Sequence, residues 1–209
     1  NKIMSKKEIF WCKTCLNMST RNRIEFDQNG RCNACVWSEE KITLDWKKRE
    51  SEFLKIVERT KKLSKGDYDV IVPVSGGKDG SYVSWVLSNK YNLRVLNVTI
   101  NPPLRSSIGH KNLENFKKGG LPLIEVNVPY EVSRKLNKTG FVEQGRPLYG
   151  WTASIFTSVI RIAKELGVNL IMYGEDGEIE YGGSTESKNK ASFSAEFIKR
   201  VYLEGQLNE

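Results

Sequence analysis

The sequence comprises 209 residues, of which 39% are hydrophobic and 28% charged, with a formal net charge of +8. This apolar content is enough for one sizeable domain and a small module. No apolar run approaches the roughly 20 residues that cross a bilayer, and the first seven residues lack the apolar core of a signal peptide. We therefore expect a soluble globular protein. The chain begins at Asn1, and we expect it to be a fragment, which leaves open whether a leader preceded it.

The positive charge is concentrated in the first third of the chain. Residues 1–65 contain sixteen Lys and Arg against nine Asp and Glu, whereas residues 66–209 contain seventeen against sixteen. Such an excess suits an anionic partner, either nucleic acid or a phosphorylated small molecule. It is also typical of a solvated, Lys-rich helix.

All four cysteines lie within the first 35 residues, as Cys12-x-x-Cys15 and Cys32-x-x-Cys35. Two such knuckles are typical of a zinc ribbon, in which each C-x-x-C turn gives two thiolates to one tetrahedral ion. Because four thiolates leave no open position, the predicted zinc is structural. We expect residues 1–40 to form this ribbon, with short strands around the metal between residues 10 and 37. Two disulfides in a secreted protein are the alternative.

An amphipathic helix is predicted to follow the ribbon. Ile42, Trp46, Phe53 and Val57 are spaced by 4, 7 and 4 residues within a highly charged stretch from about Thr43 to Ser64. We expect residues 41–65 to connect the ribbon to a second domain that begins at residue 66 and runs to residue 209.

The stretch from Asp69 to Ser81 organises this second domain. Five apolar residues lead into Ser75-Gly76-Gly77-Lys78-Asp79-Gly80-Ser81, and apolar residues then recur with helical spacing. This order predicts a buried strand, a tight loop and a helix. A Ser-Gly-Gly loop has no side-chain bulk, so its N–H groups and the helix dipole can hold a phosphate. A Walker A loop would need glycine at Val72, and the dinucleotide G-x-G-x-x-G pattern is absent.

The following residues predict an α/β domain with a parallel sheet. A strand at 94–100, a helix at about 108–118 and a strand at 122–128 follow the loop helix, and such repeats form parallel sheets with right-handed crossovers. Ligands of these sheets bind outside the carboxyl ends of the strands. We therefore expect residues 97–101 near the nucleoside and the loop after Val128 near a second substrate.

A long, apolar and mostly buried helix is predicted at residues 151–166. A strand at 168–173 would then deliver Gly174 and Glu175 to the same sheet edge, followed by Asp176, Glu178 and Glu180. These four acids would hold Mg²⁺ or position ammonia, or would form a solvated loop; Glu175 is favoured because it directly follows the strand. The last helix is expected at about 191–203.

Two further residues each have a functional and a structural interpretation. His110 is the single histidine, and we expect it on the surface rather than as a base. Trp151 would line a substrate pocket or pack in the core.

The loop from Ser75 to Ser81 resembles the S-G-G-x-D-S loop of the PP-loop ATP pyrophosphatases, a superfamily with an adenine nucleotide alpha hydrolase-like, Rossmann-like fold. Its members cleave ATP between the α and β phosphates. The resemblance implies an ATP site made of Val74, Ser75, Gly76, Gly77, Lys78, Asp79, Gly80, Ser81, Thr99 and Gly174. It also implies that Asp79 holds the Mg²⁺–pyrophosphate end of ATP and that Lys78 contacts a phosphate. Gly80 stands where the superfamily has serine, so a hydroxyl contact is lost or shifted to Ser81.

The order of the motifs is similar to that of the N-acetyl sugar amidotransferases of bacterial surface-polysaccharide and flagellin-glycan biosynthesis, which includes lipopolysaccharide and nonulosonic acid synthesis. These motifs are the cysteine ribbon, the helix, the loop, Tyr173-Gly174-Glu175 and Glu180-Tyr181-Gly182-Gly183. The resemblance covers essentially the whole chain. It implies a ligase that uses ATP and ammonia to turn an acetamido group into an acetamidino group, with Asp79, Lys78 and Glu175 as catalytic residues. It further implies that the chain is truncated after Glu209.

The resemblance also implies the surroundings of the protein. Use of ATP points to the cytoplasm, where cysteines stay reduced. Ammonia is expected from a separate glutaminase subunit, because the chain has no cysteine outside the ribbon and a single histidine, and so no Cys–His pair of its own. The other partner is the N-acetyl sugar substrate, and nucleic acid is not expected.

Two other functions stay open. A tRNA-modifying PP-loop enzyme, such as a thiolase, would suit the basic ribbon. Thiolation generally needs cysteines near the ATP site, and residues 36–209 have none. A non-catalytic nucleotide sensor would bind ATP without turnover, which the glycine at position 80 would suit.

Overall fold

The structure is a computed structural model that describes residues 8–186, 188, 190 and 194–201. The chain divides into two compact units. The sheet unit is Glu50–Glu175, and the ribbon unit is made of the described residues among 1–49 and 176–209. The described residues among 176–201, which we expected in the ATP-binding domain, therefore group with the cysteine-containing residues.

Three parallel strands form the sheet, in the order β1-β2-β3. They are β1 (Val70–Pro73), β2 (Val95–Ile100) and β3 (Leu123–Val126). The prediction of an α/β unit with a parallel sheet is confirmed. The strand predicted at 168–173 is wrong in extent, because only an isolated parallel bridge joins Ile171 to Ile71 in β1. It is held by the Ile71 N–H, which donates to the Leu170 carbonyl at 3.0 Å, and by the Met172 N–H, which donates to the Ile71 carbonyl at 2.9 Å.

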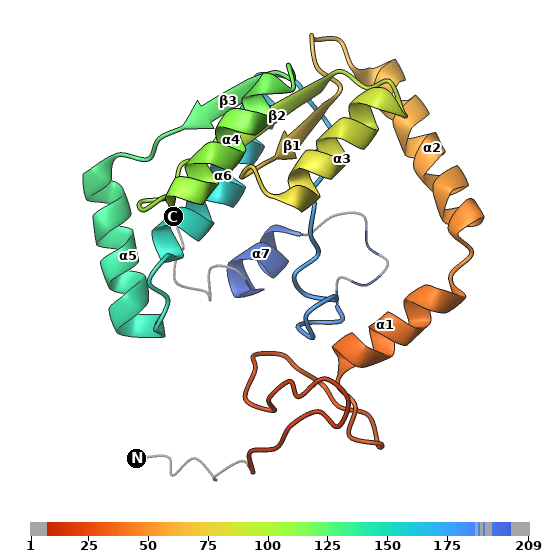
Figure 1. Ribbon diagram of the computed structural model, residues 1–209, viewed down its shortest axis with the longest axis vertical. Coiled ribbons are helices and arrows are strands. Elements are labelled where there is room, and N and C mark those ends of the chain that lie inside the picture. Colours follow the sequence, from red (N-terminus) through yellow and green to blue (C-terminus); the bar gives the residue numbers. More distant parts are fainter. Residues whose placement is uncertain (1–7, 187, 189, 191–193, 202–209) are drawn as a thin grey trace. The chain divides into compact units, whose positions relative to one another are not determined.

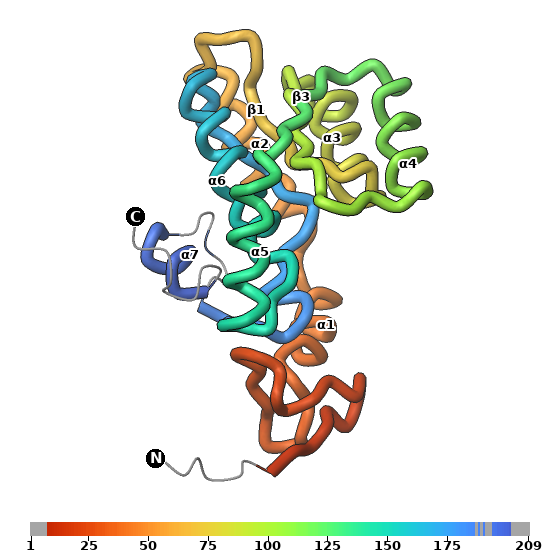
Figure 2. Tube along the Cα trace, turned by 90° about the vertical axis from the view of Figure 1, so that its left-hand side faces the viewer, coloured from red at the N-terminus to blue at the C-terminus, as the bar shows by residue number. Residues whose placement is uncertain are grey.

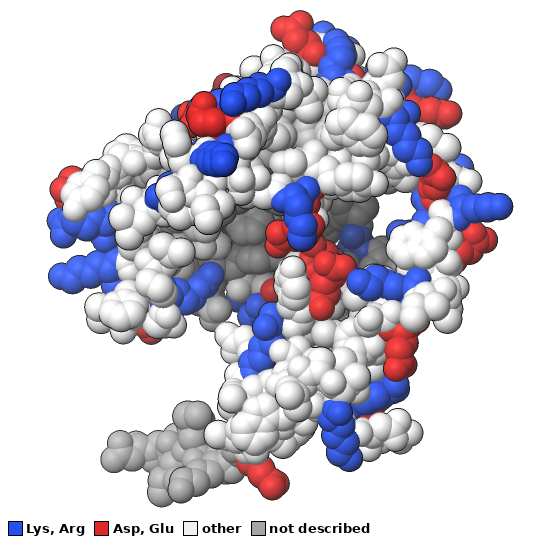
Figure 3. Space-filling model, in the orientation of Figure 1, with Lys and Arg blue, Asp and Glu red and all other residues white. Residues whose placement is uncertain are grey.

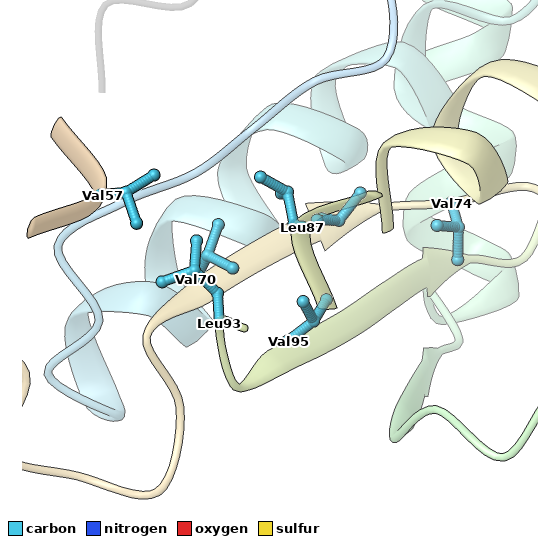
Figure 4. Close-up of a cluster of buried hydrophobic side chains, with 7 residues drawn as sticks. Val57, Val70, Val74, Leu87, Leu93 and Val95 are labelled. Carbon is cyan, nitrogen blue, oxygen red and sulfur yellow. The ribbon is translucent and has the colours of Figure 1, made fainter. Parts of the chain in front are cut away.

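Helices cover both faces of the sheet (Figures 1 and 2). The helices α3 (Lys78–Asn89) and α4 (Ser107–Lys118) lie on one face, and α6 (Tyr149–Glu165) lies on the other. Strand residues alternate between two apolar cores, as a period of two requires. The α3 side is formed by Val57, Val70, Val72, Val74, Leu87, Leu93 and Val95 (Figure 4). The α6 side is formed by Ile71, Leu96, Val98, Ile100, Val159, Ala163 and Val168.

The helix α5 (Tyr130–Gln144) was not predicted. It begins directly after Pro129, so a helix stands where we expected a loop after Val128; the place of a second substrate near these residues stays a prediction. Helix α5 packs closely on α6, because a Cβ at Gly140 would lie 2.2 Å from the Tyr149 Cβ and one at Gly150 would lie 2.7 Å from the Leu136 Cβ. In a sequence, a glycine inside a helix argues against the helix, because it lowers helix propensity. Here the absence of a Cβ at each glycine allows the two helices to pack closely.

The predicted apolar helix at 151–166 is confirmed as α6. Its Trp151 packs in the core, and the Trp151 Nε1–H donates to the Ile100 carbonyl at 3.1 Å. His110 lies exposed in α4, as expected.

The predicted connecting helix is confirmed as α2 (Trp46–Leu63). Only the later part of its apolar stripe is covered. Val57 is buried, whereas Trp46 is 59% exposed; Ile42, which was predicted in the same stripe, precedes α2 and is 84% exposed. Helix α2 carries seven Lys and Arg against three Glu, so a large share of the positive charge of the first 65 residues lies on this helix, at the right of Figure 3.

The ribbon unit contains little regular structure besides α1 (Asn33–Thr43) and α7 (Ala195–Val201). The strands predicted between residues 10 and 37 are wrong: two isolated antiparallel bridges, Trp11 with Met18 and Phe26 with Cys32, stand in their place. Helix α1 instead begins directly after Cys32, the first residue of the second C-x-x-C pair. Of the helix expected at 191–203, residues 191–193 and 202–203 lie outside the described residues. Among the residues that the structure describes, no helix is long and apolar enough to cross a membrane.

Candidate nucleotide and metal sites

The four cysteines meet at one point of the ribbon unit. Their sulfurs all lie within 4.8 Å of one another, with 3.8 Å between Cys12 and Cys35 and 3.5 Å between Cys15 and Cys32. A tetrahedral zinc ion with Zn–S bonds of roughly 2.3 Å separates its sulfurs by about 3.8 Å. The cluster therefore fits a structural zinc ion without rearrangement of the chain.

The local backbone favours a thiolate at one of the four positions, Cys12. Burial opposes ionisation of Cys12, but N–H groups of Cys15, Cys32 and Thr14 donate to its sulfur and lower its pKa to about 6. Cys12 is then largely a thiolate at neutral pH. Burial and the sulfurs of the other three cysteines raise the pKa of Cys35 well above its ordinary value. Four thiolates can share this space only when a cation compensates them, which is the property of a metal site.

The loop between β1 and α3 is shaped by contacts that only glycine permits. Gly76 has a φ of +84°, and a Cβ there would lie 2.8 Å from the Leu113 N of α4. Helix α3 begins at Lys78 without a capping side chain. Since a helix leaves its first N–H groups without intrahelical partners, a bare helix start after a glycine loop suits the oxygens of a phosphate.

Gly80 and Gly174 bring two distant segments together at the same loop. A Cβ at Gly80 would lie 2.8 Å from the Pro73 carbonyl oxygen, and a Cβ at Gly174 would lie 2.6 Å from the Gly80 N. The structure thus places Gly174 beside the loop, as the sequence implied. It also gives a physical reason for Gly80, because a serine there would collide with the end of β1.

Asp79 and Lys78 stand on the surface of the first turn of α3. The Lys78 ammonium donates to both carboxylate oxygens of Asp79 at 2.7 Å. Their side chains are 87% exposed for Lys78 and 38% exposed for Asp79. Asp79 is therefore reachable by a ligand and is paired with a cation that solvent or a phosphate can replace.

The side chains expected near the nucleoside are mostly inaccessible. Thr99 is 1% exposed and Asn97 is fully buried. The Asn97 Oδ1 accepts from the Ser84 hydroxyl at 2.7 Å, and its Nδ2 donates to the Pro122 carbonyl at 3.0 Å. Both side chains are therefore closed off from a ligand in solution.

Asn101, at the end of β2, belongs to a surface network that the sequence indicated only in part. The Asn101 Nδ2 donates to the Asn127 Oδ1 at 2.7 Å, and the Asn101 Oδ1 accepts from the Arg105 guanidinium at 2.5 Å. Sequence reasoning missed Arg105 and Asn127. The only signal for either was its place after the carboxyl end of a strand, where ligands of parallel sheets bind.

The acids after residue 174 do not assemble into one site. Among the described residues, the cysteines form the one group of three or more metal-type ligands that meet. Glu178 is paired with Arg23, Glu180 with Lys41, and the Asp176 carboxylate accepts the N–H groups of Glu178 and Ile179. Of the alternatives for these acids, a magnesium site made of all four is therefore not formed among the described residues. Glu175, which is exposed, stays the candidate among them.

Comparison with known proteins places no family name on the chain. No family model matches it, and no curated protein matches it. One similar solved structure is the NH3-dependent NAD synthetase of Campylobacter jejuni in complex with the nitrate ion, with 10% identity and a TM-score of 0.49, covering 64% of this chain and 58% of that one. Another is a predicted subunit of tRNA methyltransferase from Methanocaldococcus jannaschii, with 19% identity and a TM-score of 0.40, covering 65% and 62%. The chain thus spans less than two thirds of the length of either protein.

Proposed function

We propose that this chain is the ATP-binding part of an amidotransferase that adenylylates the acetamido group of an N-acetyl sugar and replaces its oxygen with ammonia, releasing AMP and pyrophosphate. One observation carries the proposal: the loop at the end of β1. Glycines at 76, 80 and 174 let backbone segments pack closely at this junction, and the loop leads into the uncapped start of α3, whose N–H groups suit a phosphate. The sequence Ser75-Gly76-Gly77-Lys78-Asp79 makes this junction similar to a PP-loop.

The residues of the loop have distinct roles in the proposed reaction. Backbone N–H groups at the start of α3 hold the departing pyrophosphate, where the helix dipole also favours negative charge. The Asp79 carboxylate would hold Mg²⁺ together with phosphate oxygens, a mode of binding that this ion favours, and the ion would neutralise charge on the pyrophosphate. Lys78, released from Asp79, contacts a phosphate.

The chemistry explains why an amide needs ATP. An acetamide carbonyl is a poor electrophile, and its oxygen does not leave as hydroxide at neutral pH. Adenylylation forms a bond from this oxygen to the α-phosphorus and breaks the bond from that phosphorus to the pyrophosphate. Ammonia then attacks the carbon, the oxygen leaves with AMP, and loss of a proton gives the amidine. Positioning of the oxygen in line with the pyrophosphate is the main task of the protein.

The sugar and the partner are proposed from the order of motifs along the sequence. A separate glutaminase would supply ammonia in the cytoplasm, and exposed Glu175, next to Gly174 at the loop, would orient it. The thiolase alternative is weakened because the four cysteines meet in a single cluster. The nucleotide-sensor alternative loses its main support, because packing against Pro73 accounts for Gly80.

The products of ATP cleavage test the proposal. Purified protein would be incubated with ATP, Mg²⁺, ammonium and a panel of free and nucleotide-linked N-acetyl sugars. AMP and pyrophosphate that depend on both ammonium and one sugar support the amidotransferase. Cleavage that depends on tRNA instead favours the thiolase-like enzyme, and ATP binding without cleavage favours the sensor.

A further inference from the structure

Within the ribbon unit, residues 8–49, here called the cysteine module, hold the segment after Glu175 through a set of specific contacts. Glu178 is the centre of this set. The Arg23 guanidinium donates to both of its carboxylate oxygens, at 3.1 and 2.9 Å, and the Glu178 side chain is 8% exposed. Arg23 itself adopts a φ of 61°, which residues other than glycine rarely take.

The two glycines of the Glu180-Tyr181-Gly182-Gly183 motif lie in close contact with Glu178 and with the cysteine module. A Cβ at Gly183 would lie 2.3 Å from the Glu178 Oε2, and the Ser184 N–H donates to this oxygen at 2.6 Å. Gly182 has a φ of +80°, and a Cβ there would lie 3.0 Å from the Asn33 Oδ1. Neither glycine can carry a side chain without disturbing the contact.

The cysteine module supplies the other half of the contact from residues beside its metal ligands. Asn33 directly follows Cys32, and the Asn33 Nδ2 donates to the Gly183 carbonyl at 2.8 Å. Lys41, further along α1, donates to the Glu180 carboxylate at 3.1 Å. Among its described residues, the cysteine module has only isolated bridges and α1 as regular structure, so a metal held by the four cysteines would contribute much of its stability.

We propose that Arg23 and Asn33 act as positioning residues that fix residues 176–186 onto the cysteine module, so that metal binding by the four cysteines orders the segment that follows Glu175. Residues 178–183, which include the Glu180-Tyr181-Gly182-Gly183 motif of the family resemblance, are here the segment that docks on this module. Glu175 and Asp176 are joined by a peptide bond, so order in the segment limits the movement of the proposed ammonia-orienting carboxylate. The inference about order does not depend on the proposed reaction.

Hydrogen–deuterium exchange on the whole protein tests the inference. Zinc is removed with a chelator under reducing conditions, and its loss is checked by metal analysis. Amides of residues 176–186 should then exchange roughly tenfold faster or more, while β1 and β2 keep their protection. Unchanged exchange in 176–186 after complete zinc loss would overturn the inference, as would freshly prepared protein that contains no zinc.

Matched variants separate the proposed contact from general damage to the module. Arg23→Ala should raise exchange in 176–186 by roughly tenfold, because it leaves the Glu178 carboxylate buried without its partner. Arg31→Ala is the control, since Arg31 also forms paired contacts with carboxylates, those of Asp27 and Glu39, within residues 27–39. Equal effects of the two variants on 176–186 would contradict a specific role for Arg23.

A variant on the opposite side of the contact provides a second readout. Coupling between metal binding and segment order is reciprocal. Gly183→Ala should therefore weaken zinc binding by roughly the same factor by which zinc slows exchange in 176–186, as measured by chelator competition. Unchanged zinc affinity in Gly183→Ala, with faster exchange in the segment, would show that order in the segment and metal binding are independent.

Discussion

At the scale of single residues, the glycines of the loop carry more information than its charged side chains. Gly80 looked like the loss of a hydroxyl contact when only the sequence was considered. The structure shows that the position has no space for a Cβ, because the Pro73 carbonyl lies 2.8 Å from where it would be. Sequence comparison cannot detect such a contact, since it depends on how closely α3 approaches the end of β1.

Gly80→Ser tests this account of the position. The added side chain should destabilise the protein by about 1–3 kcal/mol, a typical cost of overpacking, and should weaken ATP binding by shifting the start of α3. Thermal unfolding and nucleotide titration measure the two effects. Gly177→Ser is the matched control, because its Cβ would meet only the Tyr181 ring at 4.0 Å. A Gly80→Ser protein as stable as the control would contradict the packing argument.

Asp79 and Lys78 should differ in their importance although they contact each other. Asp79→Ala is expected to abolish ATP turnover, because the Mg²⁺–pyrophosphate group loses its anionic anchor. Lys78→Ala should only weaken turnover, since backbone N–H groups still hold the phosphates. Circular dichroism should be unchanged in both, as both side chains are exposed. Full activity of Asp79→Ala would show that the site lies elsewhere.

At the scale of elements, strands with apolar runs and helices with a regular apolar spacing were predictable. The elements β1, β2, α4 and α6 follow from periodicity and turn residues. The helix α5 did not, because Gly140 interrupts its pattern and is tolerated only by close contact with Tyr149 on α6. In the ribbon, two isolated bridges stand where strands were predicted, because the cysteine spacing indicates metal ligands and does not define strand pairing.

The start of β1 carries an ion pair with a testable pH dependence. Asp69 is buried, and although burial opposes its ionisation, hydrogen bonds from Arg94 hold the pKa of Asp69 below its ordinary value. An acid with a lowered pKa stabilises the fold above its unfolded pKa of about 3.9, and this contribution is lost as the pH falls through the folded pKa.

Asp69→Asn should therefore lower the free energy of unfolding by about 1–3 kcal/mol at pH 7. The difference from the unchanged protein should shrink as the pH falls below about 4. Urea denaturation between pH 3 and pH 7 measures it, with Asp67→Asn as an exposed control. A difference that stays constant over this range would mean that Asp69 acts through packing and not through its charge.

At the scale of the whole molecule, the sequence indicated that the chain has two parts but not which residues belong to each. Charge, cysteine spacing and the glycine loop separate a cysteine-containing part from a sheet that carries the glycine loop. Nothing in the sequence pattern showed that the described residues among 176–201 belong with the cysteines, because this grouping rests on side-chain contacts such as Arg23 with Glu178 over 155 residues of chain.

Loss of the metal should affect the two units unequally. Cys32→Ser removes one ligand of the proposed zinc site and should unfold the cysteine module, while the sheet unit, which has its own cores on both faces of the sheet, stays largely folded. Metal analysis should find one zinc ion per unchanged chain. Urea unfolding monitored by circular dichroism should show a retained main transition in the variant. Loss of that transition would mean that the sheet unit depends on the metal.

The most direct test of the central claim follows the acetamido oxygen. The enzyme, supplied with ammonium or its glutaminase, would be given ATP and the N-acetyl sugar that supports AMP release, with ¹⁸O in the acetamido group. Because the proposed reaction joins this oxygen to the α-phosphorus, each amidine formed should be accompanied by one ¹⁸O in AMP and by unlabelled pyrophosphate. Amidine formed with unlabelled AMP, or with ADP and phosphate as products, would contradict adenylylation by this protein.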